Sequence, residues 1–314
     1  MKSVLIACKK YIPVDLRRII YGIIIKPYLL FVHSPRICLL DWKWRFKLFF
    51  EFYFGKGKRY PVEYKEAAKF SFLYGPSLVI GDFLFHYLDL DIEVFLCEKS
   101  NLFYVLFNGK RLYFKRGLSE KEVQDSFKSL LLEQDSRSPH SYTGDNFKVD
   151  NGSVLFDVGA AEGIFTLANI DKIKHAYLFE CEDEWIEALN MTFSLWKDKI
   201  TIVQKYVSNM NDRYNISLDD FIDKNISPNY VKMDIEGSEY KALLGAINII
   251  RCKRVKWAIC IYHKHEDCEE ISSLFNKFDY KQSFSDGLMF VRWDDNRYPI
   301  NFPYFRKGIL RIQK

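Results

Sequence analysis

The feature that most constrains this chain is an apolar run that ends in an acid and a turn of small residues. Residues 154–163 read VLFDVGAAEG. Such a run predicts a buried parallel strand, a tight turn, and then a helix over about residues 164–170. Because glycine lets backbone approach a ligand closely, we expect this turn to bind a ligand at the carboxyl edge of an open α/β sheet. The residues of the predicted turn site are Asp157, Gly159, Ala160, Ala161, Glu162 and Gly163.

The acid that closes the next apolar run narrows the choice of ligand. Residues 176–179 read AYLF and are followed by Glu180, at an offset where an acid accepts hydrogen bonds from the hydroxyls of a ribose. A dinucleotide site usually has glycine at the position of Ala161, which leaves room for a pyrophosphate. The pattern therefore favours S-adenosylmethionine, with Asp157 near its amino-acid end. Cys181 and Ser208 are further candidate contacts. An ordinary strand–helix turn with a chance acid is the alternative.

A second group of ionisable residues lies in residues 231–239, which read VKMDIEGSE. A lysine inside an apolar strand is costly unless it is paired, and Lys232 lies on the same face of the strand as Asp234. We expect Asp234 to emerge at the carboxyl edge of the sheet and Glu236 to begin the next helix. Three ionisable groups at a ligand-facing edge indicate a functional site. An ion pair that only orders the strand is the alternative.

Histidines near the same edge are candidates for proton transfer. His263 follows the next predicted strand, where a histidine whose pKa is near the working pH could take a proton from a hydroxyl. His140 and Tyr142 lie in a polar loop before the glycine turn and are candidate substrate contacts at the rim of the site. We predict no metal centre, although Asp234 and Glu236 could hold a magnesium ion.

The order of predicted elements indicates an α/β fold, a doubly wound sheet with an antiparallel C-terminal hairpin and an N-terminal α+β extension. Asn108-Gly109 predicts a hairpin between residues 103–107 and 111–115, and Ser119 with Glu122 forms a capping box that opens a helix to about Glu133. Asp286-Gly287 predicts the C-terminal hairpin. Further predicted strands are 147–149, 200–207, 230–233 and 255–262, and a long helix is predicted over 237–250. The predicted regions are a basic, aromatic-rich helical segment (1–60), a small α+β region (61–145) and the main domain (146–314).

Charge and apolar residues are mixed in an unusual way near the N-terminus. Residues 1–60 contain 13 Lys or Arg and 3 Asp or Glu. Apolar stripes at helical spacing over residues 14–25 and 39–53 either lie on an anionic membrane or pack on the main domain, and the sequence leaves both open. Lys26 and Pro27 interrupt the most apolar stretch, so we expect no spanning helix. Seven cysteines without a CxxC pair indicate reduced thiols, and we predict a cytoplasmic protein, with peripheral contact at the inner membrane face as the open alternative.

Taken together, these stretches resemble the FkbM-type family of S-adenosylmethionine-dependent methyltransferases. The resemblance rests on VLFDVGAAEGIFTL, YLFECEDEW, SLDDF, YVKMDIEGSEYKALLGA and IYHKHED, which cover about residues 150–270. The KxDxEGxE stretch is the specific part, and Cys181 stands where many members have proline. The resemblance implies a class I methyltransferase (Rossmann-like) fold and methyl transfer to a hydroxyl of a sugar, polyketide or other small molecule. Members with an added N-terminal region often belong to bacterial surface-glycan assembly, so a glycan or lipid-linked sugar is the expected acceptor.

The resemblance also suggests a role for each ionisable residue. His263 is the first choice as base and Asp234 the second, with Lys232 and Glu236 holding the acceptor or tuning the base. A related group of sugar methyltransferases uses magnesium. A nicotinamide oxidoreductase is disfavoured by Ala161, and a nucleic-acid methyltransferase by the lack of an NPPY-like or catalytic PC motif, so we expect no nucleic-acid partner. A non-catalytic glycan-binding scaffold would need no acids at the sheet edge.

Overall fold

The computed structural model describes residues 13–222, 226–252, 254–292 and 302–314. Its largest sheet within these ranges has seven strands in the order β11-β14-β10-β9-β4-β5-β6. All neighbours from β10 to β6 are parallel, and β14 is antiparallel to both β10 and β11. This is the predicted doubly wound α/β sheet. The strands are β4 (Val154–Val158), β5 (His175–Phe179), β6 (Ile200–Val203), β9 (Tyr230–Met233), β10 (Lys256–Cys260), β11 (Lys281–Phe284) and β14 (Ile309–Gln313).

Two apolar clusters cover the two faces of this sheet. One joins it to α7 (Glu120–Gln134), α8 (Ile164–Asn169) and α9 (Asp183–Thr192). The other joins it to α10 (Leu218–Phe221), α11 (Glu239–Leu244), α12 (Ile247–Cys252) and α13 (Asp267–Asn276). The strand order reverses between β4 and β9, since β5 continues to one side and β10 to the other. Open α/β sheets bind ligands at the carboxyl ends of such a strand pair, so the fold places a ligand site beside Asp157 and Asp234.

The hairpin at Asn108-Gly109 and the capping box at Ser119 are both confirmed. β1 (Phe95–Cys97), β2 (Leu102–Phe107) and β3 (Lys110–Tyr113) form a small antiparallel sheet. The Ser119 side chain and Glu122 cap each other's backbone at the start of α7. Val105 of β2, Leu112 of β3 and Val123 of α7 lie in the same apolar cluster as β4 and β5. This region therefore shares the core of the main sheet.

Three predicted elements near the sheet differ from the structure. Residues 200–207 form two strands, because β6 ends at Val203 and β7 (Tyr206–Val207) pairs with β8 (Asn215–Ile216). The helix predicted over 237–250 divides at Gly245, whose carbonyl accepts a hydrogen bond from the amide of Asp219. A Cβ atom on Gly245 would lie 2.2 Å from the carbonyl oxygen of Ser208, so this close approach requires glycine. The strand predicted at 147–149 is absent, and Phe147 forms only an isolated bridge with Gly144.

The C-terminal strands are antiparallel, as predicted, but their partners are further away in sequence. β11 pairs with β14 rather than with the segment after Asp286-Gly287. That segment leaves the sheet, and β12 (Met289–Phe290) pairs with β13 (Phe305–Arg306). Phe290 packs against Trp44 with ring centroids 5.3 Å apart, so contact with the N-terminal helices replaces the expected hairpin. The end of the predicted strand, Trp293, lies outside the described residues.

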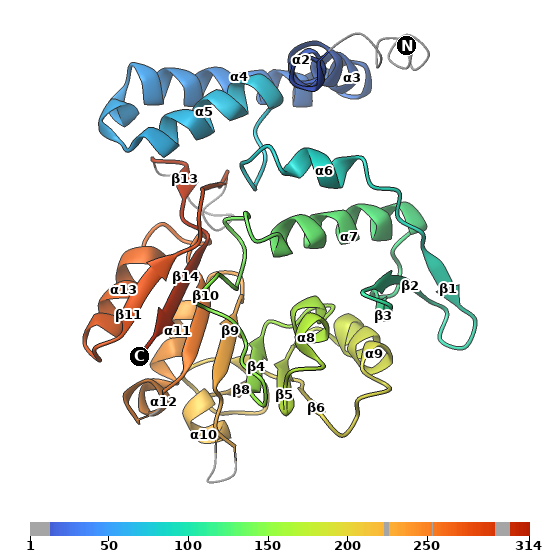
Figure 1. Ribbon diagram of the computed structural model, residues 1–314, viewed down its shortest axis with the longest axis vertical. Coiled ribbons are helices and arrows are strands. Elements are labelled where there is room, and N and C mark those ends of the chain that lie inside the picture. The colour runs from blue at the N-terminus through green and yellow to red at the C-terminus, as the bar shows by residue number, and fades with distance from the viewer. Residues whose placement is uncertain (1–12, 223–225, 253, 293–301) are drawn as a thin grey trace.

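The N-terminal helices gather at one end of the molecule (Figure 1). They are α2 (Val14–Ile20), a π-helical turn (Tyr21–Ile25), α3 (Lys26–His33), α4 (Pro35–Tyr53), α5 (Val62–Tyr74) and α6 (Leu84–Leu88). The helical conformation continues through Lys26 and Pro27, and Pro27 stands in the first turn of α3, where proline is tolerated. Leu48 and Phe52 of α4 pack with Leu288 and Phe305. Within the described ranges, no helix is both long and apolar enough to cross a bilayer.

Candidate active site

The glycine turn after β4 has the conformation and the close contacts that require small residues. Gly159 has a φ of +76°, and a Cβ atom there would lie 1.8 Å from the carbonyl oxygen of Asp234. Gly163 has a φ of +81° and lies against the ring of Phe193. Ala161 also has a left-handed φ, of +46°. The turn therefore passes directly against the end of β9 and brings the two predicted groups of site residues together.

Gly159→Ala should test this contact. We expect it to lower the free energy of unfolding by about 2–4 kcal/mol, because it combines a left-handed φ with a clash against backbone. Gly152→Ala is the matched control, since Gly152 has the same φ of +76° but open space around its Cα. The control should lose only about 1 kcal/mol. Urea denaturation measures both variants, and equal losses would contradict the tight contact at Gly159.

Asp157 and Lys232 form a buried ion pair. The Lys232 Nζ lies 3.2 Å from the Asp157 Oδ1 and also donates a hydrogen bond to the Gly159 carbonyl. Thr166 donates to the other oxygen of Asp157 over 2.7 Å. Burial alone would lower the pKa of Lys232, but the carboxylates of Asp157 and Asp234 outweigh it and raise that pKa. The pair thus joins β4 to β9 and to the turn, and Asp157 lines neither of the two cavities described below.

A cavity of about 490 Å³ lies beside the turn. This volume is in the range of small-molecule sites. Five of its lining residues were predicted from the sequence as cofactor contacts: Gly159, Ala161, Glu180, Cys181 and Ser208. Asp234 and Glu236 also line it. The Oγ atom of Ser208 is buried without a hydrogen-bond partner among the described residues, so the cavity wall retains a polar group for a ligand.

The Glu180 carboxylate is held in place by three backbone amides. One oxygen accepts a hydrogen bond from the Ala161 amide over 2.9 Å. The other accepts from the amides of Cys181 and Glu182, over 2.7 Å and 2.9 Å. A carboxylate has about four acceptor positions, so capacity remains for a ligand hydroxyl. Glu180 thus links the glycine turn to the end of β5 and presents an oriented charge to the cavity.

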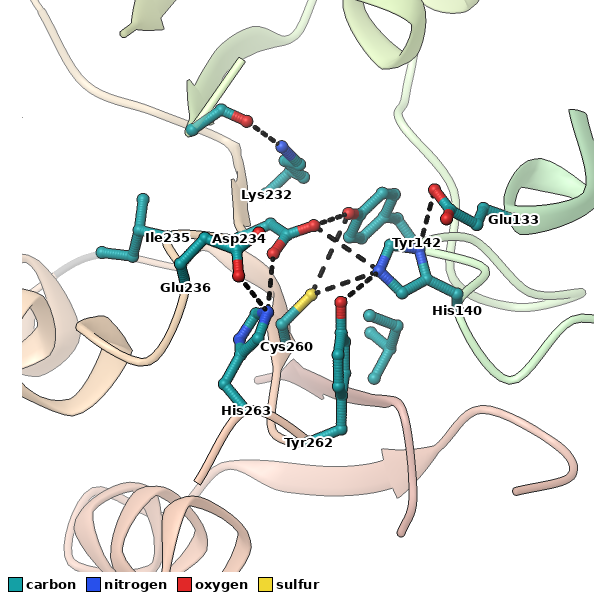
Figure 2. Close-up of polar contacts among 12 residues, drawn as sticks. Glu133, His140, Tyr142, Lys232, Asp234, Ile235, Glu236, Cys260, Tyr262 and His263 are labelled. Carbon is teal, nitrogen blue, oxygen red and sulfur yellow. Dashed lines mark hydrogen bonds and ion pairs between the residues drawn. The ribbon is translucent and has the colours of Figure 1, made fainter. Parts of the chain in front are cut away.

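Asp234 is the centre of a buried network (Figure 2). The Tyr142 hydroxyl donates to its Oδ2 over 2.6 Å, and the His140 Nε2 lies 3.5 Å from the same oxygen. The His263 Nε2 lies 3.5 Å from the Oδ1. Although burial opposes the charge, hydrogen bonding from His140 and the charges of Lys232 and His263 hold the pKa of Asp234 well below its usual range. His140 and Tyr142, predicted at the rim of the site, are each 3% exposed and contact Asp234 from inside the protein.

His263 is oriented by a buried acid. Its Nδ1 lies 2.9 Å from the Oε1 of Glu239, whose side chain is fully buried. Its Nε2 lies 3.5 Å from Glu236, which stands in a turn with a φ of +54° rather than in the predicted helix. Burial alone would lower the pKa of His263, but Glu239, Asp234 and Glu236 raise it to about 9. A group with this pKa carries a proton at neutral pH, whereas a pKa near the working pH was expected.

A second, smaller cavity of about 140 Å³ adjoins the same residues. Gly159, Ala161 and Asp234 line both cavities, while Ala160 and Glu162 line only the second. Glu133 of α7 also lines it, and its Oε2 lies 3.9 Å from the His140 Nδ1. Burial raises the pKa of Glu133, and it raises that of Glu162 to about 7. Two acids in a small cavity favour a cationic ligand, because a nearby positive charge stabilises their ionised forms.

Two groups of side chains among the described residues have the spacing of metal ligands. One is Asp234, Glu236 and His263, and the other is His140, Asp234 and Cys260. The first contains the two carboxylates that could hold magnesium. The Glu236 side chain is 90% exposed, and both Asp234 oxygens already face hydroxyl or imidazole groups. Imidazole and thiol groups suit transition metals better than magnesium, so neither set indicates a magnesium site.

The sequence interpretation missed Glu133 and Glu239. Glu239 lies within the KxDxEGxE stretch, in the first turn of α11. Glu133 lies at the end of α7, a hundred residues before Asp234, and nothing local indicates its position. Cys260 and Tyr262 also contact His140, with the Tyr262 hydroxyl 3.3 Å from the His140 Nε2.

Residues 212–282 match a protein-family model that is described as "Methyltransferase FkbM domain". The resemblance to the FkbM-type family is confirmed. The FkbM match includes Asp234, Glu236, Glu239 and His263, and it supports a methyltransferase function for this chain. No curated protein sequence matches the chain.

Solved structures with a similar arrangement include methyltransferase FkbM from Methylobacillus flagellatus KT, with 22% identity and a TM-score of 0.43 over 53% of this chain and 45% of that one. The chain thus spans less than half the length of that protein. An rRNA methylase from Streptococcus thermophilus has 14% identity and a TM-score of 0.37, over 53% of this chain and 89% of that chain. Precorrin-6y C5,15-methyltransferase from Geobacter metallireducens GS-15 has 9% identity and a TM-score of 0.38, over 64% of this chain and 94% of that chain.

Proposed function

We propose that the protein is an S-adenosylmethionine-dependent O-methyltransferase that acts on a hydroxyl of a sugar or glycan, including a lipid-linked surface polysaccharide. The observation that carries the proposal is one cavity at the switch point of the sheet that both Glu180 and Asp234 line. The family match supports the methyl-transfer part of the proposal. We also propose a cytoplasmic location, because five cysteines in the described ranges are free.

The cavity suits an adenosine. Glu180 would accept the ribose hydroxyls, and the buried Ser208 Oγ would pair with a polar atom of the base. The acids of the smaller cavity, Glu133 and Glu162, would face the ammonium group at the amino-acid end of the cofactor. When bound, S-adenosylmethionine supplies an activated methyl group on a positively charged sulfur. The turn from Gly159 to Gly163 would hold it by close backbone contact.

The residues around Asp234 would align the acceptor hydroxyl and remove its proton. Asp234 lines both cavities and is ionised. His263 remains the better base, because a group with a pKa of about 9 accepts a proton more strongly than an aspartate whose pKa is low. Since only neutral His263 can accept a proton, turnover should rise with pH up to about 9. Glu239 would keep the imidazole oriented, so that its Nε2 faces Asp234.

Glu180→Ala tests the cofactor part of this proposal. We expect it to weaken binding of S-adenosylhomocysteine by about 1–3 kcal/mol, because charged hydrogen bonds to the ribose are lost. Glu184→Ala is the control, since Glu184 lies in the next helix, α9, where it pairs with Lys115. Isothermal titration calorimetry measures both. Unchanged affinity in Glu180→Ala would remove the assignment of the larger cavity to adenosine.

The acceptor is tested separately. Surface glycans from cells with and without the gene should differ in mass spectra by one methyl group on a sugar residue. Re-expression of the wild-type protein should restore that methyl group, and the Asp234→Asn variant should not. If the glycans are identical and a methylated small molecule disappears instead, the acceptor belongs to another class of hydroxyl compound.

A further inference from the structure

The outward face of α4 has a composition that is unusual for a helix in contact with water. Its exposed residues are Pro35, Arg36, Ile37, Leu39, Leu40, Lys43, Phe46 and Phe50. Six of these are apolar, two are basic and none is acidic. Leu39 is 71% exposed and Phe50 is 55% exposed. The water-facing side of a surface helix is normally polar with charges of both signs.

The inward face of the same helix is fully engaged with the protein. Leu48 and Phe52 are buried in the cluster with β12 and β13. The Arg45 Nε lies 2.5 Å from the Oδ2 of Asp41, and its guanidinium donates to the Phe72 carbonyl over 2.8 Å. α4 is therefore held in place by one face and presents a second, opposite apolar face to the outside.

The helices before α4 continue this exposed apolar surface. Tyr21, Ile24, Tyr28 and Phe31 recur at intervals of three and four residues and are 42–61% exposed. In the described part of the chain, 25 large apolar side chains are exposed, and 15 of them lie within residues 14–62. The helices α2 to α5 that carry them lie together at one end of the molecule (Figure 1). Exposed apolar side chains gathered in this way mark an interaction surface.

The charges on this surface identify the kind of partner. Between residues 13 and 60 the chain has ten Lys or Arg and three Asp or Glu. Asp41 is paired with Arg45 inside the protein, and Asp15 lies 3.6 Å from Arg18. Arg36 and Lys43 remain exposed among the leucines and phenylalanines of α4. Apolar side chains with lysine and arginine are the pattern of helices that lie in the headgroup region of an anionic bilayer.

We propose that the outward face of α2, α3 and α4 docks on an anionic membrane surface. The apolar side chains enter the headgroup region, and Arg36 and Lys43 contact lipid phosphates. A second copy of the chain suits the face less well, because a two-fold contact would bring the same basic residues opposite each other. An acceptor carried on a lipid would make this contact useful, since enzyme and substrate would share one surface. The docking itself does not depend on the proposed reaction.

Flotation of the full-length protein with lipid vesicles tests this proposal. The vesicles are phosphatidylcholine alone, or phosphatidylcholine with phosphatidylglycerol at about 3:1. We expect binding to the anionic vesicles at about 0.01 M salt and at least tenfold weaker binding at about 1 M salt, where charges are screened. Arg36→Gln/Lys43→Gln should lower the partition coefficient by about 25-fold, at about fivefold per charge. Leu39→Ser/Phe50→Ser should lower it at least tenfold by removing inserted apolar area.

Matched variants away from the face act as controls. Lys172→Gln/Lys174→Gln removes two exposed charges elsewhere, and Leu195→Ser removes an apolar side chain that is 81% exposed. Both should bind vesicles within twofold of the wild type, and circular dichroism should show that all variants are folded. Protein that stays unbound with anionic vesicles at low salt would overturn the proposal. So would a dimer in sedimentation that only Leu39→Ser/Phe50→Ser dissociates while vesicle binding is unchanged, because the face would then belong to a second copy.

Discussion

Asp234→Asn is expected to reduce methyl transfer by about 10²–10⁴-fold. The Asp234 carboxylate lines both cavities and is the shared partner of Tyr142, His140 and His263. Asparagine keeps the shape of the side chain but offers one acceptor oxygen and no charge. The histidines on either side then lose the group that orients them, and a reaction that depends on alignment of a hydroxyl with the donor is slowed strongly.

Activity is measured as the transfer of tritium-labelled methyl groups from S-adenosylmethionine to a glycan extract of cells that lack the gene. The control is Asp125→Asn, which changes an exposed residue of α7 and should keep full activity.

A pH profile of the reaction rate adds a second measurement. The wild-type rate should rise about tenfold per pH unit toward pH 9, because His263 must lose its proton before it can act as a base. Asp234 is among the charges that raise the pKa of His263, so the rise should move to lower pH in Asp234→Asn. Full turnover in this variant would show that Asp234 is only structural.

Lys232→Met should lower the free energy of unfolding by about 3–5 kcal/mol. The substitution keeps most of the side-chain volume but leaves the Asp157 carboxylate buried at 1% exposure without its cation. The loss should be smaller at low pH. Burial raises the pKa of Asp157 above its value in the unfolded chain, so the native variant takes up a proton more readily than the unfolded one as pH falls. Stability of the variant should therefore increase as pH falls from 8 to 5.

Urea denaturation at both pH values measures this effect. Lys256→Met is the control, because Lys256 pairs with Asp150 over 2.8 Å at the surface and its loss should cost less than about 1 kcal/mol. The double variant Asp157→Leu/Lys232→Met removes both charges and should recover most of the stability. A Lys232→Met protein as stable as the control would contradict the buried pair.

The sequence predicted the parts of the fold that depend on local patterns. β4, β5 and β9 lie where their apolar runs were found, and the glycine turn, the Asn108-Gly109 hairpin and the capping box at Ser119 are as expected. Each of these has a signal within a few residues. The site residues at the ends of β4, β5 and β9 could be named for the same reason, because parallel strands end at one edge of a sheet.

Features that depend on distant packing could not be predicted in the same way. Lys232 pairs with Asp157 of the neighbouring strand rather than with Asp234. Burial would lower the pKa of His263, but Glu239 of α11, together with Asp234 and Glu236, raises it. Segment 288–290 leaves the sheet because the N-terminal helices offer it an apolar surface. In each case, the residues in contact belong to different elements, and no helical or strand periodicity in the sequence links them.

Calorimetric titration of the wild-type protein with S-adenosylhomocysteine and with NAD tests the central claim most directly. The oriented Glu180 carboxylate predicts that S-adenosylhomocysteine binds in the micromolar range, about −8 kcal/mol. Position 161 is alanine, where a dinucleotide site usually has glycine, so we expect no measurable heat with NAD. Tighter binding of NAD than of S-adenosylhomocysteine would contradict the account.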